Sequence, residues 1–136
     1  MFQVNPNTGA ITMHRGDTGS VLYSAERESG EPFGEDDVAL YTITDSQKKI
    51  IRQDIYPLDD ATLGNGNVLV QFHNSDTDHL PLGTYSTEIR YIINPRFEET
   101  VINGVTIRKV VDGDIVRTPE PLGQSTLTIK DVYGEV

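Results

Sequence analysis

The chain has 136 residues, 36% of them hydrophobic, and its four Phe and six Tyr suffice to fill the core of one domain. Its 21 acidic residues outnumber 11 basic ones, and the net charge of -10 argues against nucleic acid and anionic membranes as partners. Cysteine is absent, which excludes disulfides, thiolate metal ligands and a catalytic thiol.

The first half of the chain is predicted to form β-strands, because apolar residues alternate between turn signals and no stretch of ten residues shows helical periodicity. Strands are expected at Ala10–His14 and Thr18–Ala25, with Arg15-Gly16-Asp17 between them as a break of hairpin type. After a polar loop, Val38–Thr44 is apolar at both alternating sets of positions. This pattern predicts a central strand that is covered on both faces.

Further strands follow a turn at Asp45-Ser46-Gln47, first at Lys48–Ile55 and then, after a loop rich in Pro, Asp and Gly, at Asn67–His73. In the second of these strands, one face carries Val68, Val70 and Phe72. The clearest alternation is in Thr84–Ile93, where one predicted face carries Tyr85, Thr87, Ile89, Tyr91 and Ile93.

Beyond Asn94-Pro95, two dipeptides predict hairpin turns with positive φ, namely Asn103-Gly104 and Asp112-Gly113. Pro119–Gly123 interrupts the pattern, and Gln124–Val132 is expected to be the last strand, with Leu127 and Ile129 facing the core. We therefore expect a single all-β domain over residues 1–136, an immunoglobulin-like antiparallel β-sandwich with an extended β-hairpin region near residues 97–117. A barrel is the main alternative.

The extended hairpin region is more apolar than a freely solvated arm, so something should cover it. Two arrangements satisfy this requirement: the ribbon folds back onto the sandwich as core, or it projects and packs against another subunit. The candidate interaction hairpin consists of Val101, Ile102, Val105, Ile107, Val110 and Val111.

A structural corner is predicted just before the clearest strand, at Leu80, Gly83 and Tyr85. In a tyrosine corner the ring packs inside, while its hydroxyl bonds a backbone group a few residues upstream. Gly83 is expected to permit a tight approach of the backbone.

Three segments, Ile11–Thr18, Leu80–Tyr85 and Gly123–Ile129, together resemble in order and spacing the N-terminal β-sandwich of phage baseplate upper proteins. In that family, found in tailed phages and prophages of Gram-positive bacteria, such modules attach receptor-binding parts to the tail. The resemblance implies a virion structural protein of the tail or baseplate whose partners are other virion proteins or further copies of itself. The chain departs from the family pattern in the extended region between Arg96 and Thr118.

No catalytic, cofactor or metal site is expected, because nucleophile elbows, phosphate loops and paired carboxylate signatures are absent from the sequence. Asn74, Asp76 and Asp78 alternate oxygen donors as a calcium loop does, but lack its Gly and distal Glu, which leaves a weak calcium site near Asp76 and Asp78 as the minor alternative. Glu35-Asp36-Asp37 and Asp59-Asp60 are interpreted as solvated loop charge.

The three histidines, His14, His73 and His79, lack the spacing of a local metal site. Arg15-Gly16-Asp17 is interpreted as a turn rather than an integrin ligand. No apolar membrane span and no signal-peptide pattern at residues 1–10 is apparent, so we expect a soluble chain that is not separately secreted.

The sequence favours a binding or scaffolding protein over an enzyme. The alternative function is a carbohydrate-binding or adhesion module, which needs exposed aromatic side chains. The chain has no Trp, so such a platform would draw on Tyr23, Tyr41, Tyr56 and Tyr133.

Overall fold

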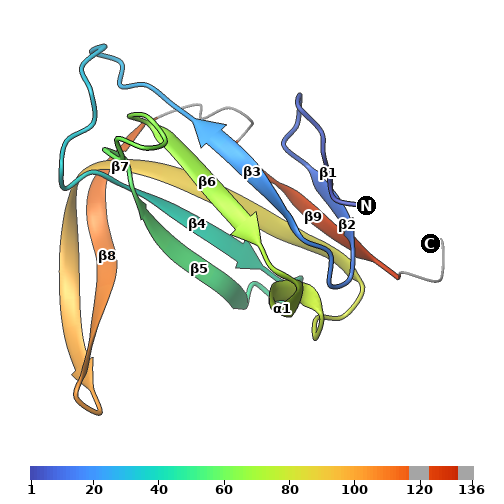
Figure 1. Cartoon of the computed structure of the whole chain (residues 1–136). Coiled ribbons are helices and arrows are strands. Elements are labelled where there is room, and N and C mark those ends of the chain that lie inside the picture. Colours follow the sequence, from blue (N-terminus) through green and yellow to red (C-terminus); the bar gives the residue numbers. More distant parts are fainter. Residues whose placement is uncertain (117–122, 132–136) are drawn as a thin grey trace.

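The computed structural model describes residues 1–116 and 123–131, with the side chains of 111, 112 and 114–116 excepted. The prediction of an all-β fold is confirmed, since the only helix in the described residues has four residues (Figure 1). The elements are β1 Gln3–Val4, β2 Ile11–His14, β3 Gly19–Ser24, β4 Val38–Thr44, β5 Ile50–Pro57, β6 Asn67–Phe72, α1 Asn74–Thr77, β7 Gly83–Ile102, β8 Val105–Val116 and β9 Gln124–Lys130. The break predicted at 119–122 lies outside the described residues. Within them, no helix has the length and hydropathy needed to cross a membrane.

The strands form two sheets that pack face to face as a sandwich (Figure 1). The larger sheet has the order β1-β2-β9-β7-β4-β5, with β8 paired to β7, and the smaller sheet consists of β3 and β6. Neighbouring strands are antiparallel except for β2 and β9, which run parallel from the pair Ile11 and Leu127 to the pair His14 and Lys130. The larger sheet is therefore mixed, in contrast to the purely antiparallel sandwich expected.

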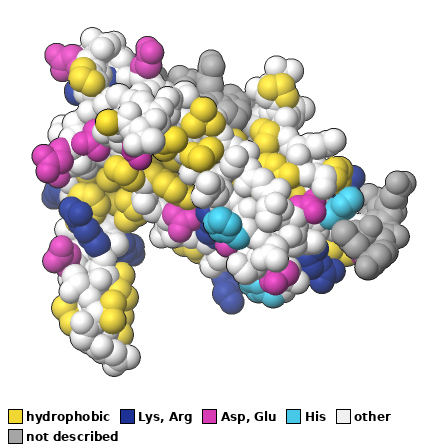
Figure 2. Space-filling view, in the orientation of Figure 1, with side chains coloured by type: hydrophobic (Ala, Val, Ile, Leu, Met, Phe, Trp, Pro, Cys, Tyr) yellow, Lys and Arg dark blue, Asp and Glu magenta, His cyan; other side chains and the backbone are white. Residues whose placement is uncertain are grey.

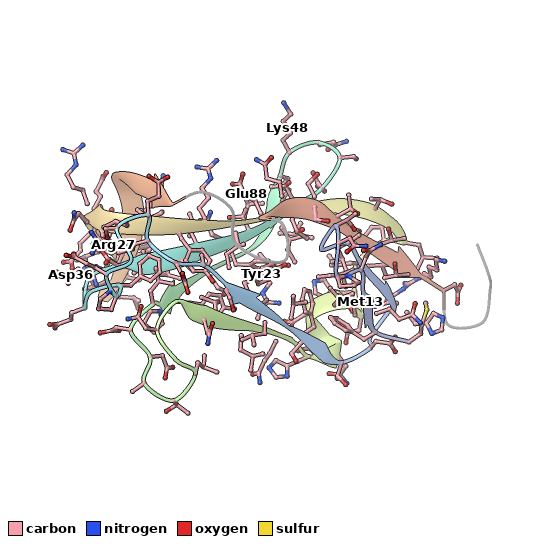
Figure 3. All side chains as sticks on the ribbon, turned by 90° about the horizontal axis from the view of Figure 1, so that it is seen from above. Met13, Tyr23, Arg27, Asp36, Lys48 and Glu88 are labelled. Atoms are coloured by element: carbon pink, nitrogen blue, oxygen red, sulfur yellow. The ribbon has the colours of Figure 1, made fainter. Side chains whose placement is uncertain are left out.

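The core lies between the two sheets and is built from alternating residues of both. Figure 3 shows Tyr23 and Met13 between the layers, whereas Lys48 and Glu88 point away from them. The alternation predicted in β6 and β7 is confirmed, because their inward side chains are buried. The fully enclosed positions of the core include Ile11, Met13, Tyr23, Tyr41, Leu58, Val68, Val70, Phe72, Tyr91, Leu127 and Ile129.

The central position of β4 is confirmed, because it lies between β5 and β7. The prediction that both of its faces are covered is correct only in part. Ala39, Tyr41 and Ile43 are buried on the inner face, whereas on the outer face Val38 is buried and Leu40 is only half-buried. An antiparallel arrangement leaves one face of a sheet open to solvent.

The hairpin predicted at Arg15-Gly16-Asp17 is also wrong, because β2 and β3 belong to different sheets. The segment is a corner that carries the chain across the sandwich, and Gly16 has φ +82°. The carboxylate of Asp17 accepts a hydrogen bond from the His14 amide at 2.9 Å, and the Gly16 amide donates to Thr77 Oγ1 at 2.9 Å. A Gly-Asp turn looks the same in sequence whether the next strand pairs or crosses over.

Candidate interaction arm

The end of β7 and β8 form a two-stranded ribbon, and this ribbon projects from the sandwich (Figure 1). We call residues 96–112 of this ribbon the arm. Its two strands pair continuously from Phe97 opposite Val110 to Ile102 opposite Val105. Asn103 and Gly104 form the turn with φ +52° and +78°, the positive values that a two-residue turn of type I′ requires.

The arm leaves the sandwich at an irregular stretch of β7. Asn94 has φ +50°, and the pairing with β8 shifts register between Ile93 and Arg96 and again before Phe97. Such bulges bend a strand and increase its twist. The predicted break at Asn94-Pro95 is therefore a bulge within one strand of 20 residues.

The second predicted hairpin, at Asp112-Gly113, is wrong, because β8 continues through these residues to Val116. Gly113 is instead a point of close approach between β8 and β7. A Cβ at Gly113 would collide with the Cγ2 methyl of Ile92 and lie 3.1 Å from the Cα of Pro95. The glycine is required for this close approach of two strands, which a turn signal in sequence does not distinguish from a turn.

The two faces of the arm have the same balance of residue types, with three apolar residues, one acidic residue, one basic residue and one Thr on each. Paired residues share a face and successive pairs alternate, so one face, which we call the Ile107 face, carries Glu98, Thr100, Ile102, Val105, Ile107 and Lys109. The opposite side, which we call the Phe97 face, carries Phe97, Glu99, Val101, Thr106, Arg108 and Val110. On the Phe97 face, the guanidinium of Arg108 lies 3.5 Å from the centre of the Phe97 ring, so the Arg108 side chain covers part of the Phe97 ring.

Four aliphatic side chains near the tip of the arm are exposed to solvent (Figure 2). The exposed fractions are 67% for Val101, 52% for Ile102, 61% for Val105 and 47% for Ile107. Val110, nearer the sandwich, is half-buried, and the side chain of Val111 lies outside the described part. Of the two arrangements left open by the sequence, the structure has the projecting ribbon.

The predicted corner lies at the opposite end of β7. The hydroxyl of Tyr85 donates to the carbonyl oxygen of Pro81 at 2.5 Å, and burial raises the pKa of this phenol. Leu80 is half-buried and packs against the core. The expected tight approach at Gly83 is absent, because a Cβ there would meet nothing within 4 Å, and glycine is favoured instead by its φ of +139°.

A polar cluster that the sequence did not reveal closes the sandwich edge between β5 and β6. The guanidinium of Arg52 lies 4.9 Å from the Phe72 ring centre, binds Asp54 Oδ2 at 2.7 Å through Nε, and donates to the Gln71 carbonyl at 2.9 Å. Burial lowers the pKa of Arg52, but the hydrogen bond and charge of Asp54 outweigh it and hold the pKa above its usual value. Arg52, Asp54 and Tyr56 alternate along β5 and so share one face of it. Only the pairing of β5 with β4 shows that this face points inward.

Beside this cluster is a surface groove of about 520 Å³. It brings His73 and His79 to one place, together with Asp76, whereas His14 lies on β2. Asp76 is engaged as a helix cap, accepting from the His73 amide at 2.7 Å, and lies 3.8 Å from Arg52. Within the described residues, no group of three or more His, Cys, Asp and Glu side chains is placed to hold a metal ion.

The tyrosines named as a carbohydrate platform are not on one surface. Tyr23 and Tyr41 are 1% and 0% exposed in the core, and Tyr56 is half-buried at the groove. Tyr133 lies outside the described residues. Among the Phe and Tyr residues of the described part of the chain, only Tyr56 lines the groove.

The chain matches no protein-family model, no curated protein and no solved structure.

Proposed function

We propose that this chain is a non-catalytic assembly domain that binds another protein through its arm. The observation that carries the proposal is the exposure of Val101, Ile102, Val105 and Ile107 on a ribbon that projects beyond the core. Soluble proteins rarely expose contiguous apolar surface of this kind unless it contacts a partner. The resemblance of three segments to phage baseplate upper proteins favours a virion tail or baseplate as the assembly.

The strand order supports an immunoglobulin-like type for the sandwich. β9, β7, β4 and β5 lie in the order that G, F, C and C′ have in that fold, and β3 with β6 faces them as B and E do. In this comparison β7 is strand F, which is where a tyrosine corner is found, and Tyr85 lies near its start. The arm is then an elongated F–G hairpin, at one end of the sandwich where such domains place binding loops.

The test compares an arm variant with a matched control. The double change Ile102→Lys and Ile107→Lys adds charge to the arm, and Leu22→Lys adds charge to another half-exposed aliphatic residue, on β3 of the smaller sheet. Each chain is co-expressed with the products of the genes that flank its own, and complexes are isolated by size-exclusion chromatography and identified by mass spectrometry.

We expect a complex with a tail protein, or with further copies of the chain, that the arm variant loses and the Leu22→Lys control retains. If the arm variant assembles as well as the unmodified chain, or if the unmodified chain assembles with nothing, the proposal is wrong.

A second candidate is a carbohydrate-binding module, favoured by the groove beside Tyr56, where an aromatic ring stands next to Asp54, Gln71 and His73. Sugars bind to rings flanked by planar polar groups. A glycan array with the unmodified chain and a Tyr56→Ala variant tests it, and an absence of signal from the unmodified chain would dispose of this candidate.

A further inference from the structure

We propose that the partner of the Ile107 face is a second copy of this chain, and that two arms pack face to face with their tips pointing in the same direction. This inference rests on the proposed function of the arm as an assembly element.

The two faces of the arm differ in how much apolar surface they expose. On the Phe97 face, Phe97 is half-buried beneath Arg108, whose guanidinium lies 3.5 Å from the ring centre, and Val110 is also half-buried. Val101, at 67%, is the one strongly exposed apolar side chain among the described residues of that face. On the Ile107 face, Ile102, Val105 and Ile107 are each about half exposed or more, at 52%, 61% and 47%. The Ile107 face therefore has more apolar surface to gain from burial.

Two copies of the arm can pack their Ile107 faces together about a two-fold axis. A two-fold axis that runs along the arm between two facing ribbons places β7 of one copy against β8 of the other, because the rotation exchanges left and right. Residues that pair across the hairpin within one copy then also face each other between copies. Ile102 faces the second copy's Val105, and Thr100 faces its Ile107.

The Ile107 face also carries one residue of each charge near its root. Toward the root of the same face, Glu98 lies opposite Lys109 in the strand register of the hairpin. Under the two-fold axis along the arm, each Glu98 faces a Lys109 of the second copy, so both root contacts join opposite charges. In the reversed arrangement, with tips pointing in opposite directions, the aliphatic tip of each arm would cover Glu98 and Lys109 of the other, which desolvates charges without pairing them.

The contact surface is small. It involves about three aliphatic side chains from each copy, and stable protein interfaces bury about 1,200 to 2,000 Å² in total. A weak dimer that forms at high concentration is therefore expected from the arms alone. The net charge of -10 on each chain also opposes association, which makes the local charge pairing at the arm roots more important.

The experiment uses charge reversal within the full chain. Glu98→Lys gives a chain with Lys at both root positions, and Lys109→Glu gives a chain with two acidic residues there. Glu99→Lys is the matched control, since it makes the same charge change one residue along β7 on the Phe97 face. Sedimentation equilibrium measures dimerisation of each chain, of the equimolar mixture of the two root variants, and of the chain carrying both changes.

We expect each root variant to dimerise more weakly than the unmodified chain, and the mixture to form a mixed dimer roughly tenfold tighter than either variant with itself, since two like-charge contacts become two opposite-charge contacts. The Glu99→Lys control should dimerise as the unmodified chain does. The chain with both changes should also regain dimerisation.

Three results would overturn the inference. If the root variants dimerise as strongly as the unmodified chain, Glu98 and Lys109 do not meet between copies. Recovery in the doubly changed chain but not in the mixture would show that the charges act only within one hairpin. An unmodified chain that stays monomeric at the highest concentration would exclude self-pairing. The proposed function would still stand in that case if the double change Ile102→Lys and Ile107→Lys abolished binding to another protein.

Discussion

The guanidinium carbon of Arg52 lies 4.9 Å from the centre of the Phe72 ring and 5.7 Å from that of Tyr41, so one arginine spans the edge where the two sheets separate. The smaller sheet has two strands, β3 and β6, and the inward residues Arg52, Asp54 and Tyr56 of β5 are half-buried. The aliphatic stem and planar head of Arg52 cover two core aromatic rings, while its Nε and Nη2 atoms donate hydrogen bonds to Asp54 and the Gln71 carbonyl and Nη1 lies 3.8 Å from Asp76 Oδ2.

Replacing this arginine by lysine is expected to destabilise the fold. Arg52→Lys keeps the charge but loses the planar stacking and the forked hydrogen bonds, which should lower the free energy of unfolding by about 1 to 3 kcal/mol. Urea denaturation measures it. Arg90→Lys is the control, because Arg90 is half exposed on the outer face of β7 and pairs with Glu88 at 2.7 Å, an interaction expected to contribute less than about 1 kcal/mol. Equal losses in both variants would show that the stacking of Arg52 is unimportant.

The tyrosine corner gives a second prediction. Tyr85→Phe removes the donor to the Pro81 carbonyl, 2.5 Å away, and leaves the buried ring in place. We expect a loss of about 0.5 to 1.5 kcal/mol in the free energy of unfolding, the usual net contribution of one hydrogen bond. Tyr56→Phe is the comparison, since its hydroxyl has only long contacts of 3.4 Å with Arg52 and Asp54. Unchanged stability in Tyr85→Phe would contradict a stabilising role for the corner.

Alkaline pH should unfold this protein through its buried tyrosines. Burial raises the pKa of Tyr23 from 10.0 to about 12, and it also raises the pKa of Tyr41 and Tyr91. The unfolded chain releases these phenol protons at lower pH than the folded chain does. The stability that the buried tyrosines contribute is therefore fully present below pH 10 and is lost as pH rises from 10 to about 12. Tyr23 alone should account for roughly 2 to 3 kcal/mol of this fall.

The measurement is urea denaturation across that pH range, with tyrosinate absorbance recorded in parallel. Tyr23→Phe should flatten part of the decline, whereas Tyr56→Phe, at a half-buried position, should flatten it less. Non-cooperative titration of all tyrosines near pH 10, without unfolding, would contradict the burial that the structure shows.

The root of the arm supplies a further test. Gly113→Ala places a methyl group against Ile92 Cγ2, and we expect a loss of about 1 to 3 kcal/mol from overpacking. The change Ile92→Leu removes the branched methyl, so Gly113→Ala should be better tolerated in that background. Gly34→Ala is the control, since its nearest contact is Asp37 Oδ2 at 3.6 Å. A full loss that persists in the Ile92→Leu background would show that the clash is not with this methyl.

The turn at the tip should affect the arm without affecting the sandwich. Gly104→Val forces a β-branched residue into φ +78°, which favours glycine. Hydrogen exchange should then accelerate at the amides of Val105 and Ile107 and stay unchanged in the core strands. Gly30→Val is matched to it, with φ +76° in a loop far along the chain, and should leave exchange in the arm unaffected. Uniformly faster exchange in Gly104→Val would mean that the arm and sandwich unfold as one unit.

Strand identity follows from local pattern in most of this chain. The alternation of Val68, Val70 and Phe72, and of Tyr85 through Tyr91, survives in the structure because a side chain's face in a strand depends only on its parity. The Asn103-Gly104 turn was likewise predictable, since a two-residue turn with positive φ at both positions favours Asn followed by Gly. The apolar character of residues 101–111 was also visible in sequence, and it indicated the arm as a candidate site.

The tertiary structure decided which strands pair and which side chains meet. Arg15-Gly16-Asp17 crosses between sheets and Asp112-Gly113 lies within a strand, because pairing depends on distant partners such as β9 for β2 and Ile92 for Gly113. Only the structure brought Arg52 onto Phe72 and left the aliphatic tip of the arm in solvent. Sequence periodicity determines the face on which a residue lies, whereas the packing of remote segments determines whether that face is covered.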